Sequence, residues 1–347
     1  MMRNEVPTIE RGEQPSGDLA SLWTGPVPTL ADVYRARNVI RPHLTPTPLL
    51  EPDGLAERLG CRVFVKCENL QPTGAFKVRG GITMMSRLSE AERARGVVAA
   101  STGNHGQSIA FAARIYGANA IVFVPERPNE LKVRAMERLG ATIIKQGADF
   151  DECFAASRRY ADDHDMHWVH SANEPDLIAG VATATLEIME AVPDLDAIFV
   201  PIGGGSGLCG ACVVGKSINP DIQVIGVQAE GAPAAYESWR RRELLELTTA
   251  DTFAEGVATR TGYELPARIL WDTVDDIMLV SDAELRRAIL TMLETTRMLA
   301  EGAGAAGLAG LFKRHTEFTG KNVAVMLSGG NLTLEALTQA LHEERPW

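Results

Sequence analysis

The sequence predicts an α/β protein with two parallel-type sheets, each covered by helices on both faces. Short apolar runs alternate with amphipathic segments from Cys61 onward, which is the pattern of β-α units in parallel sheets. No motif recurs at a fixed period, so the alternation does not indicate a solenoid. A chain of 347 residues is also long enough to form two domains.

The individual elements follow from this alternation. Thr29 is a candidate helix cap, and the segment after it has helical spacing. Residues 1–27 are polar, contain several prolines and glycines, and are expected to form an N-terminal arm. We expect strands near 62–66, 97–101, 120–124, 141–145, 167–170, 197–202, 223–229, 276–280 and 322–327. The expected helices include 30–40, 104–116, 130–139, 151–163, 177–191 and 282–300.

The charge of the chain restricts its partners. Lys and Arg number 34 against 45 Asp and Glu, which gives a net charge of -11. Nucleic acid or an anionic membrane is therefore not an expected partner, because phosphate contacts need a basic patch. No apolar run reaches the roughly 18 residues that span a bilayer, and the N-terminus lacks an apolar signal region. We expect a small-molecule ligand and a cytoplasmic location.

The five cysteines do not indicate a disulfide framework, since their number is odd and they are scattered along the chain. Cys209 and Cys212 form a C-x-x-C pair, but no second pair completes a zinc site. We therefore predict no metal or redox chemistry at this pair.

Lys77 is the first candidate for chemistry. It follows the strand expected at 62–66 and the turn Pro72-Thr73-Gly74, and it lies next to Phe76 and small residues. Desolvation in such a setting lowers the pKa of an amine, and an amine of lowered pKa can form a Schiff base. A solvated surface lysine is the plain alternative.

Gly203-Gly204-Gly205-Ser206-Gly207-Leu208 lies between an expected strand and a helix. Consecutive glycines let main-chain N–H groups converge on an anion, and the helix adds its positive end. The run from Gly205 to Gly210 also satisfies G-x-G-x-x-G, and Glu230 ends the next strand as a ribose-binding acid would. This loop alone therefore keeps an NAD-dependent dehydrogenase open as an alternative.

Two further loops carry polar groups. Ser101-Thr102-Gly103-Asn104-His105-Gly106-Gln107 joins a strand to a helix, where hydroxyls, an amide and the helix dipole suit a carboxylate. A helix cap without a ligand is the alternative. Ser328 ends the last expected strand, and the glycines after it let its hydroxyl approach a flat ring.

Together these segments resemble the fold-type II pyridoxal-phosphate enzymes, specifically the threonine/serine dehydratase and serine racemase group. The matching motifs occur in the family's order and cover roughly residues 40–335. They are Gln71-Pro72-Thr73-Gly74-Ala75-Phe76-Lys77-Val78-Arg79-Gly80, the two loops beginning at Ser101 and Gly203, Glu301-Gly302-Ala303-Gly304-Ala305-Ala306, and Ser328-Gly329-Gly330-Asn331.

The resemblance implies the tryptophan synthase β-like fold and a domain division. A small domain, 93–167, would be inserted in a large cofactor-binding domain formed by 28–92 and 168–347. Pyridoxal 5'-phosphate would lie between the two domains. Family members are commonly homodimers or homotetramers, so the resemblance also implies a homo-oligomer.

The resemblance assigns roles to individual residues. Lys77 would hold the cofactor and act as a catalytic base, and Thr102 occupies the position of a second proton donor. The substrate carboxylate would be bound by Ser101, Thr102, Asn104 and His105. The cofactor would contact Asn104 at the ring hydroxyl, the phosphate loop Gly203, Gly204, Gly205, Ser206, Gly207 and Leu208, Ser328 at the ring nitrogen, and Gly256 and Glu301 beside the ring.

The activity implied is that of a lyase, which converts threonine, serine or a related β-hydroxy amino acid to a 2-oxo acid and ammonia. A dehydratase of hydroxyectoine catabolism and an amino-acid racemase remain alternatives. Ala75 and Val181 depart from the family's usual residues at positions that could shape the substrate pocket. The family's metal-binding acidic stretch retains only Glu230 here, which agrees with the prediction of no metal.

Overall fold

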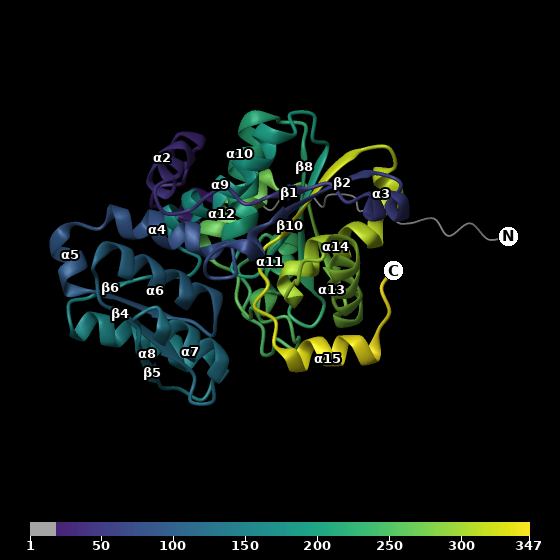
Figure 1. Cartoon of the computed structure of the whole chain (residues 1–347). Helices are drawn as coiled ribbons and strands as arrows, with labels where there is room; N and C mark the ends of the chain where they lie inside the picture. The colour runs from purple at the N-terminus through teal and green to yellow at the C-terminus, as the bar shows by residue number, and fades with distance from the viewer. Residues whose placement is uncertain (1–18) are drawn as a thin grey trace.

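The computed structural model describes residues 19–347, which form two parallel-type β-sheets with helices between and around them (Figure 1). The larger sheet contains β1 (Leu49–Leu50), β2 (Arg62–Cys67), β7 (Ala197–Pro201), β8 (Gln223–Ala229), β9 (Asp276–Val280) and β10 (Asn322–Leu327). The smaller sheet contains β3 (Val97–Ala100), β4 (Ala120–Val124), β5 (Thr142–Lys145) and β6 (His167–Trp168).

The six-stranded sheet has the order β1-β2-β10-β7-β8-β9, and every neighbouring pair is parallel except β1 with β2. Strand β10 occurs last in the chain yet lies between β2 and β7. Its residues pair in register with β2 from Asn322 opposite Arg62 to Leu327 opposite Cys67. The carboxyl ends of β2, β7 and β10 therefore meet at one edge of the sheet.

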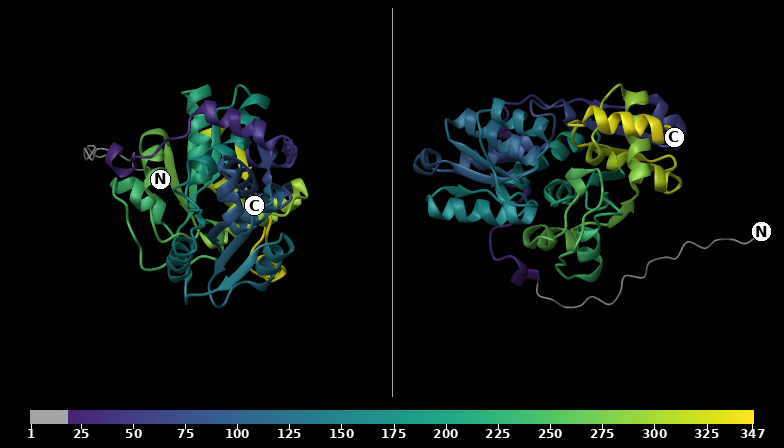
Figure 2. Two further views of the ribbon diagram at one scale, coloured as in Figure 1. Left: turned by 90° about the vertical axis from the view of Figure 1, so that its left-hand side faces the viewer. Right: turned by 90° about the horizontal axis from the view of Figure 1, so that it is seen from below.

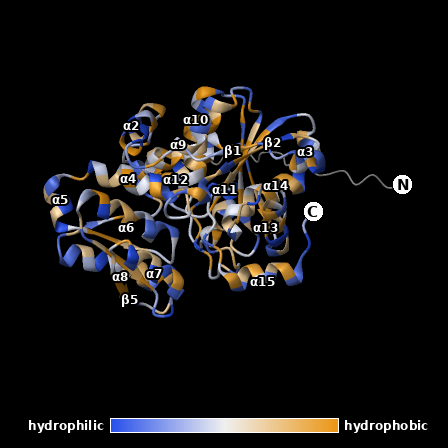
Figure 3. Ribbon diagram, viewed as in Figure 1, coloured by the Kyte–Doolittle hydropathy of each residue, from blue (hydrophilic) through white to orange (hydrophobic). Residues whose placement is uncertain are grey.

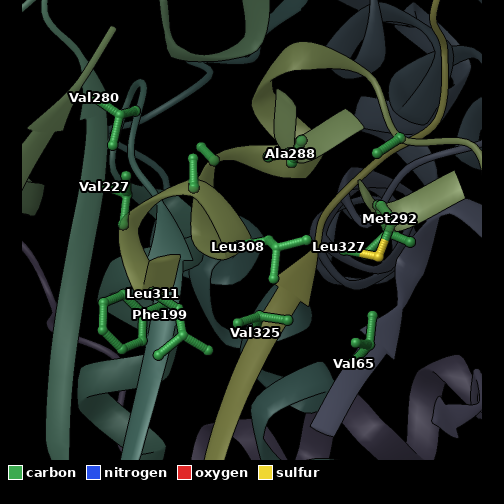
Figure 4. Close-up of a cluster of buried hydrophobic side chains, with 14 of the residues drawn as sticks. Val65, Phe199, Val227, Val280, Ala288, Met292, Leu308, Leu311, Val325 and Leu327 are labelled. Atoms are coloured by element: carbon green, nitrogen blue, oxygen red, sulfur yellow. The ribbon is translucent and has the colours of Figure 1, made fainter. Parts of the chain in front are cut away.

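Both faces of this sheet are covered because its strands are apolar on both sides. Alternate residues of β10 face opposite ways: Val325 belongs to one core cluster and Ala324 to the other. The helices α3 (Asp53–Leu59), α13 (Asp282–Thr296) and α14 (Gly302–Arg314) cover the first face. Figure 4 shows Phe199, Leu308 and Val325 in this cluster. The helices α9 (Pro175–Ala191), α10 (Ser206–Ile218) and α12 (Glu264–Thr273) cover the second face.

The four-stranded sheet has the order β5-β4-β3-β6, with all pairs parallel. One of its faces packs on α4 (Lys77–Arg87), α6 (Asn104–Tyr116) and α7 (Glu130–Arg138). The other face packs on α8 (Phe150–Asp163). Figure 2 shows this unit, in blue and teal, beside the green and yellow six-stranded unit.

The remaining elements lie around the two sheets. They are α1 (Leu19–Leu22), α2 (Leu30–Ile40), α5 (Glu90–Arg95), α11 (Ala234–Arg241), α15 (Leu334–Glu343), and the 3-10 turns η1 (Glu68–Leu70), η2 (Glu255–Val257) and η3 (His315–Phe318). Hydrophilic residues concentrate on the outward faces of the helices (Figure 3). No helix within 19–347 has the length and apolar character to cross a membrane.

The α/β fold predicted from the sequence is confirmed, with a few corrections at element ends. The helix expected at 282–300 ends at Thr296, because Arg297 takes a left-handed conformation (φ 64°) and its N–H caps the Leu293 carbonyl. The strand expected at 167–170 is shorter, and β1 was not predicted. Of the expected N-terminal arm, residues 1–18 lie outside the described residues, and the part that follows contains α1.

Candidate active site

A cavity of about 800 Å³ lies where the two sheet units meet. Residues that follow the carboxyl ends of β3, β7 and β10 line it, including Ser101, Gly203 and Ser328. In open α/β sheets ligands bind at this end of the strands. The cavity is therefore the candidate site.

Lys77 enters the cavity from a turn that the last strand holds in place. Gly74 has φ +69°, and its N–H donates to the Gln71 carbonyl, which closes the turn before α4. Phe76 N donates to the Ser328 carbonyl (2.9 Å), and Gly330 N donates to the Gly74 carbonyl (2.9 Å). The lysine at the start of α4 is thereby fixed to the loop after β10.

The amine of Lys77 differs from a surface ammonium group. Its Nζ donates to Ser206 Oγ (2.7 Å), and no carboxylate of residues 19–347 pairs with it. Desolvation lowers the pKa of Lys77 to about 8. Lys66, by contrast, forms an ion pair with Glu187 (2.5 Å) and donates to the Thr47 carbonyl (2.7 Å). Lys77 is therefore the lysine prepared to react as a neutral amine.

The glycine loop between β7 and α10 presents main-chain donors. Gly205 has φ +97°, and Cys209 N is the first N–H to bond into the helix, to the Gly205 carbonyl (2.9 Å). The N–H groups of Ser206, Gly207 and Leu208 precede it and have no intrahelical acceptor, so they are available to an anion. The Leu208 side chain is buried in the core and does not line the cavity.

The start of α6 lines the cavity and offers a second group of polar side chains. Ser101 Oγ accepts from Gly103 N (3.0 Å) and Gly106 N (2.8 Å), so it caps the helix and keeps its own proton for a ligand. His105 is buried, and neither of its ring nitrogens has a hydrogen-bond partner. Burial and the nearby Lys77 charge lower the pKa of His105 to about 3, so the ring is neutral at pH 7. A neutral imidazole donates a hydrogen bond without adding charge.

Glu301 and Ser328 lie on the side of the cavity formed by the large sheet. Burial raises the pKa of Glu301, although its Oε1 accepts from Asn104 Nδ2 (2.6 Å). A Cβ on Gly329 would come within 2.2 Å of the same oxygen, so glycine is required there. Gly203 and Gly256 approach each other equally closely, since a Cβ on Gly203 would meet the Gly256 carbonyl at 2.2 Å.

The structure thus gathers the residues that the sequence singled out around one cavity. Lining it are Lys77, Ser101, Thr102, Asn104, His105, Gly203, Gly204, Gly205, Ser206, Gly207, Gly256, Glu301 and Ser328. Leu208 is the exception, because its place in the site is limited to its main-chain N–H. The functional roles of these residues remain predictions.

Sequence reasoning missed the charged outer wall of the cavity. Lys132 of α7 forms an ion pair with Glu255 across the cavity. Arg260 likewise pairs with Asp149 (3.1 Å) and contacts Asp151, both at the start of α8. These pairs connect the two sheet units. No local pattern identifies them, because each joins residues more than a hundred positions apart in the chain.

Within residues 19–347, no group of three or more His, Cys, Asp or Glu side chains is arranged to hold a metal ion. All five cysteines are free and buried.

Residues 40–329 match the family model described as pyridoxal-phosphate dependent enzyme, and the chain belongs to this family. It is 38% identical over 315 residues to the L-threonine ammonia-lyase of Thermotoga maritima, covering 91% of this chain and 78% of the relative. It is 36% identical to the L-threo-3-hydroxyaspartate ammonia-lyase of Saccharomyces cerevisiae, covering 89% and 95%. The structure of maize serine racemase superposes with a TM-score of 0.86 at 28% identity, covering 92% and 98%.

The residues of the cavity fit pyridoxal 5'-phosphate, the cofactor of this family. An amine without a counter-ion suits its aldehyde, and the start of α10 suits its phosphate. Ser328 is nearly buried and offers a neutral hydroxyl on the side opposite α6. The glycine loop is thus explained without a dinucleotide.

The lowered pKa of Lys77 predicts how cofactor-free protein takes up pyridoxal phosphate. The rate should rise with pH and reach half its maximum at about pH 8, because only the unprotonated amine attacks an aldehyde. Stopped-flow absorbance after mixing at a series of pH values measures this rate. A free alkyl amine, with its pKa of about 10.4, serves as the control. A midpoint for the protein equal to that of the control would contradict a desolvated Lys77.

Proposed function

We propose that the protein is an ammonia-lyase that converts a 3-hydroxy amino acid of the threonine or serine type to a 2-oxo acid and ammonia. One observation carries the proposal: a lysine amine of lowered pKa lies on the same cavity as two helix starts, those of α6 and α10. The similarity to threonine and hydroxyaspartate ammonia-lyases supports this reaction class.

Different residues of the chain bind the substrate, take up the proton and position the amine. When bound, pyridoxal phosphate supplies an electron sink that makes the α-proton of an amino acid acidic. The start of α6, with Ser101 and Thr102, binds and orients the substrate carboxylate. Lys77 Nζ takes the α-proton, and Ser206 Oγ keeps the amine in position through its hydrogen bond. Neutral His105, at the start of α6, does not compete for the proton.

The outer part of the cavity favours a substrate whose side chain is longer than that of threonine. Arg127 lines the cavity, and no acidic side chain of residues 19–347 pairs with it. Thr248, Thr249 and Asp251 also line the cavity and add further polar groups. This lining supports a specialised relative that acts on a longer polar 3-hydroxy amino acid, alongside the threonine and serine activities. Hydroxyectoine catabolism remains one setting for such an enzyme.

Racemase activity is the second candidate, and Thr102 is the observation in its favour. Thr102 is an exposed residue on the cavity that Lys77 also lines, so its hydroxyl is a candidate second group to exchange a proton with the α-carbon. The similarity to maize serine racemase agrees with this.

A substrate panel tests the proposal. The yellow, cofactor-loaded protein is incubated with L-threonine, L-serine, L-threo-3-hydroxyaspartate and longer 3-hydroxy amino acids, and 2-oxo acid and ammonia are assayed. We expect equal amounts of both products from at least one of them. Chiral chromatography of the remaining amino acid measures racemisation in the same samples. A loaded protein that releases no 2-oxo acid from any member of the panel would refute the lyase assignment.

A cytoplasmic homodimer or homotetramer stays a prediction for the intact protein. Light scattering of the purified, loaded protein measures its mass directly.

A further inference from the structure

A chain of side-chain hydrogen bonds runs beneath the cavity from the lysine turn to Glu301. Asn331 Nδ2 donates to the Thr73 carbonyl (2.9 Å) and to Asn104 Oδ1 (2.7 Å). Asn104 Nδ2 then donates to Glu301 Oε1 (2.6 Å). Asn331 does not line the cavity, whereas Asn104 and Glu301 do. The chain therefore connects a residue outside the cavity to two residues on its wall.

The Thr73 carbonyl determines the direction of every hydrogen bond in this series. A main-chain carbonyl only accepts, so the Asn331 atom facing Thr73 must be the amide nitrogen. The second N–H of that nitrogen meets Asn104, and so the Asn104 atom facing it must be the oxygen. The Asn104 nitrogen then faces Glu301. Rotating either amide by 180° would place two acceptors together and leave a donor unpaired.

The residues that fix the orientation of Asn104 lie on the opposite side of the cavity. Asn104 begins α6, which packs on the four-stranded sheet, while Asn331 and Glu301 adjoin the six-stranded sheet. Gly74 allows the close approach, because a Cβ there would lie 2.5 Å from Asn331 Oδ1. Asn104 Nδ2 has two N–H groups, and Glu301 accepts one of them. The other is left for a ligand in the cavity.

We propose that Asn331 is a positioning residue, which fixes the Asn104 carboxamide so that it presents a donor, and not an acceptor, to the bound cofactor. The inference rests on the proposed function only for the choice of substrate. It assigns to Asn331 an effect on the cofactor that is transmitted entirely through Asn104.

Two variants test this assignment. Asn331→Asp keeps the size of the side chain but replaces the donating nitrogen by an acceptor, and Asn331→Ala removes both. We expect each to change the ratio of the absorption bands of bound pyridoxal phosphate, and to lower kcat for L-threonine by about 10- to 100-fold, as is usual when a residue that orients a ligand-binding group is lost. KM should change less than kcat. Asn331→Asp should have the larger effect, because it repels both the Thr73 carbonyl and Asn104 Oδ1.

Asn69→Ala is the matched control. Asn69 Nδ2 donates to the Leu299 carbonyl (3.2 Å) close to the same loop, and within residues 19–347 it forms no hydrogen bond with Asn104. We expect the control to retain the wild-type spectrum and a kcat within about twofold of wild type. Thermal unfolding of all variants separates a loss of folding from a loss of orientation.

A double-mutant cycle decides between positioning and a general structural role. If Asn331 acts through Asn104, adding Asn331→Ala to Asn104→Ala will change neither the spectrum nor kcat further. Additive effects would overturn the inference, and so would an unchanged spectrum and kcat in both single variants. Failure of the loaded wild-type protein to release a 2-oxo acid would instead refute the proposed function, whereas the absorption bands test the inference without turnover, so the two failures are distinguishable.

Discussion

Replacement of Lys77 by alanine is expected to abolish catalysis and the visible absorbance of lysine-bound cofactor. Within residues 19–347, Lys77 is a lysine that lines the cavity, bonds to a neutral hydroxyl and lacks a carboxylate partner. Loss of a catalytic base lowers turnover by about two to four orders of magnitude, and loss of the attachment point adds to this. Steady-state 2-oxo acid release and the absorption spectrum of the loaded protein measure both effects.

Lys216→Ala is a suitable control for this prediction. Lys216 lies on α10 and forms an ion pair with Asp275 (2.7 Å), away from the residues that line the cavity. It should retain wild-type activity and colour. Borohydride trapping followed by peptide mass spectrometry locates the modified lysine directly. An adduct on any other lysine would contradict the site described above.

A large loss of folding stability is expected when Arg79 is replaced. Arg79 lies two residues after Lys77 in α4. Its guanidinium bonds Glu68 through two contacts (2.7 and 2.8 Å) and Glu187 through two more (2.7 and 2.9 Å). Burial opposes ionisation of Glu68, but Arg79, Thr47 and Lys66 together hold its pKa below the usual value. Arg79→Met should lower the free energy of unfolding by about 3–5 kcal/mol, because the buried Glu68 would lose its ion-pair partner. Urea unfolding at pH 7 measures this loss.

Arg240→Met is the matched control for Arg79. Arg240 also forms an ion pair with a glutamate, Glu237 (3.1 Å), but on the surface of α11. Surface pairs contribute about 0–1 kcal/mol, so the control should unfold close to wild type. Equal losses in the two variants would show that burial does not determine the importance of the Arg79 pair.

The fold could be predicted largely because its strands are apolar and glycines occur in the loops between them. The run around Val63 and Val65 and the run ending at Leu327 are short and apolar, which is what buried parallel strands require. The candidate site could be predicted for a similar reason. Gly205 and Gly74 adopt positive φ values at turns, and those turns carry candidate site residues.

What the sequence did not reveal depends on contacts between distant parts of the chain. Asn331 bonds a residue 227 positions away, and Arg260 bonds one 111 positions away. Neither side chain differs locally from an ordinary polar loop residue. Likewise, Arg297 ends α13 through a left-handed conformation that the apolar spacing before it does not indicate. Such features follow from the packing of the units and not from the local pattern.

The central place of β10 has a consequence for the newly made protein. Until the segment Asn322–Leu327 has left the ribosome, β2 and β7 have no common neighbour, and the large sheet stays in two pieces. The turn that presents Lys77 also lacks its support until then, because Phe76 N in that turn donates to the Ser328 carbonyl. Vitamin B6 should therefore attach only after β10 has emerged, and nascent chains arrested before β10 should remain colourless when the vitamin is present.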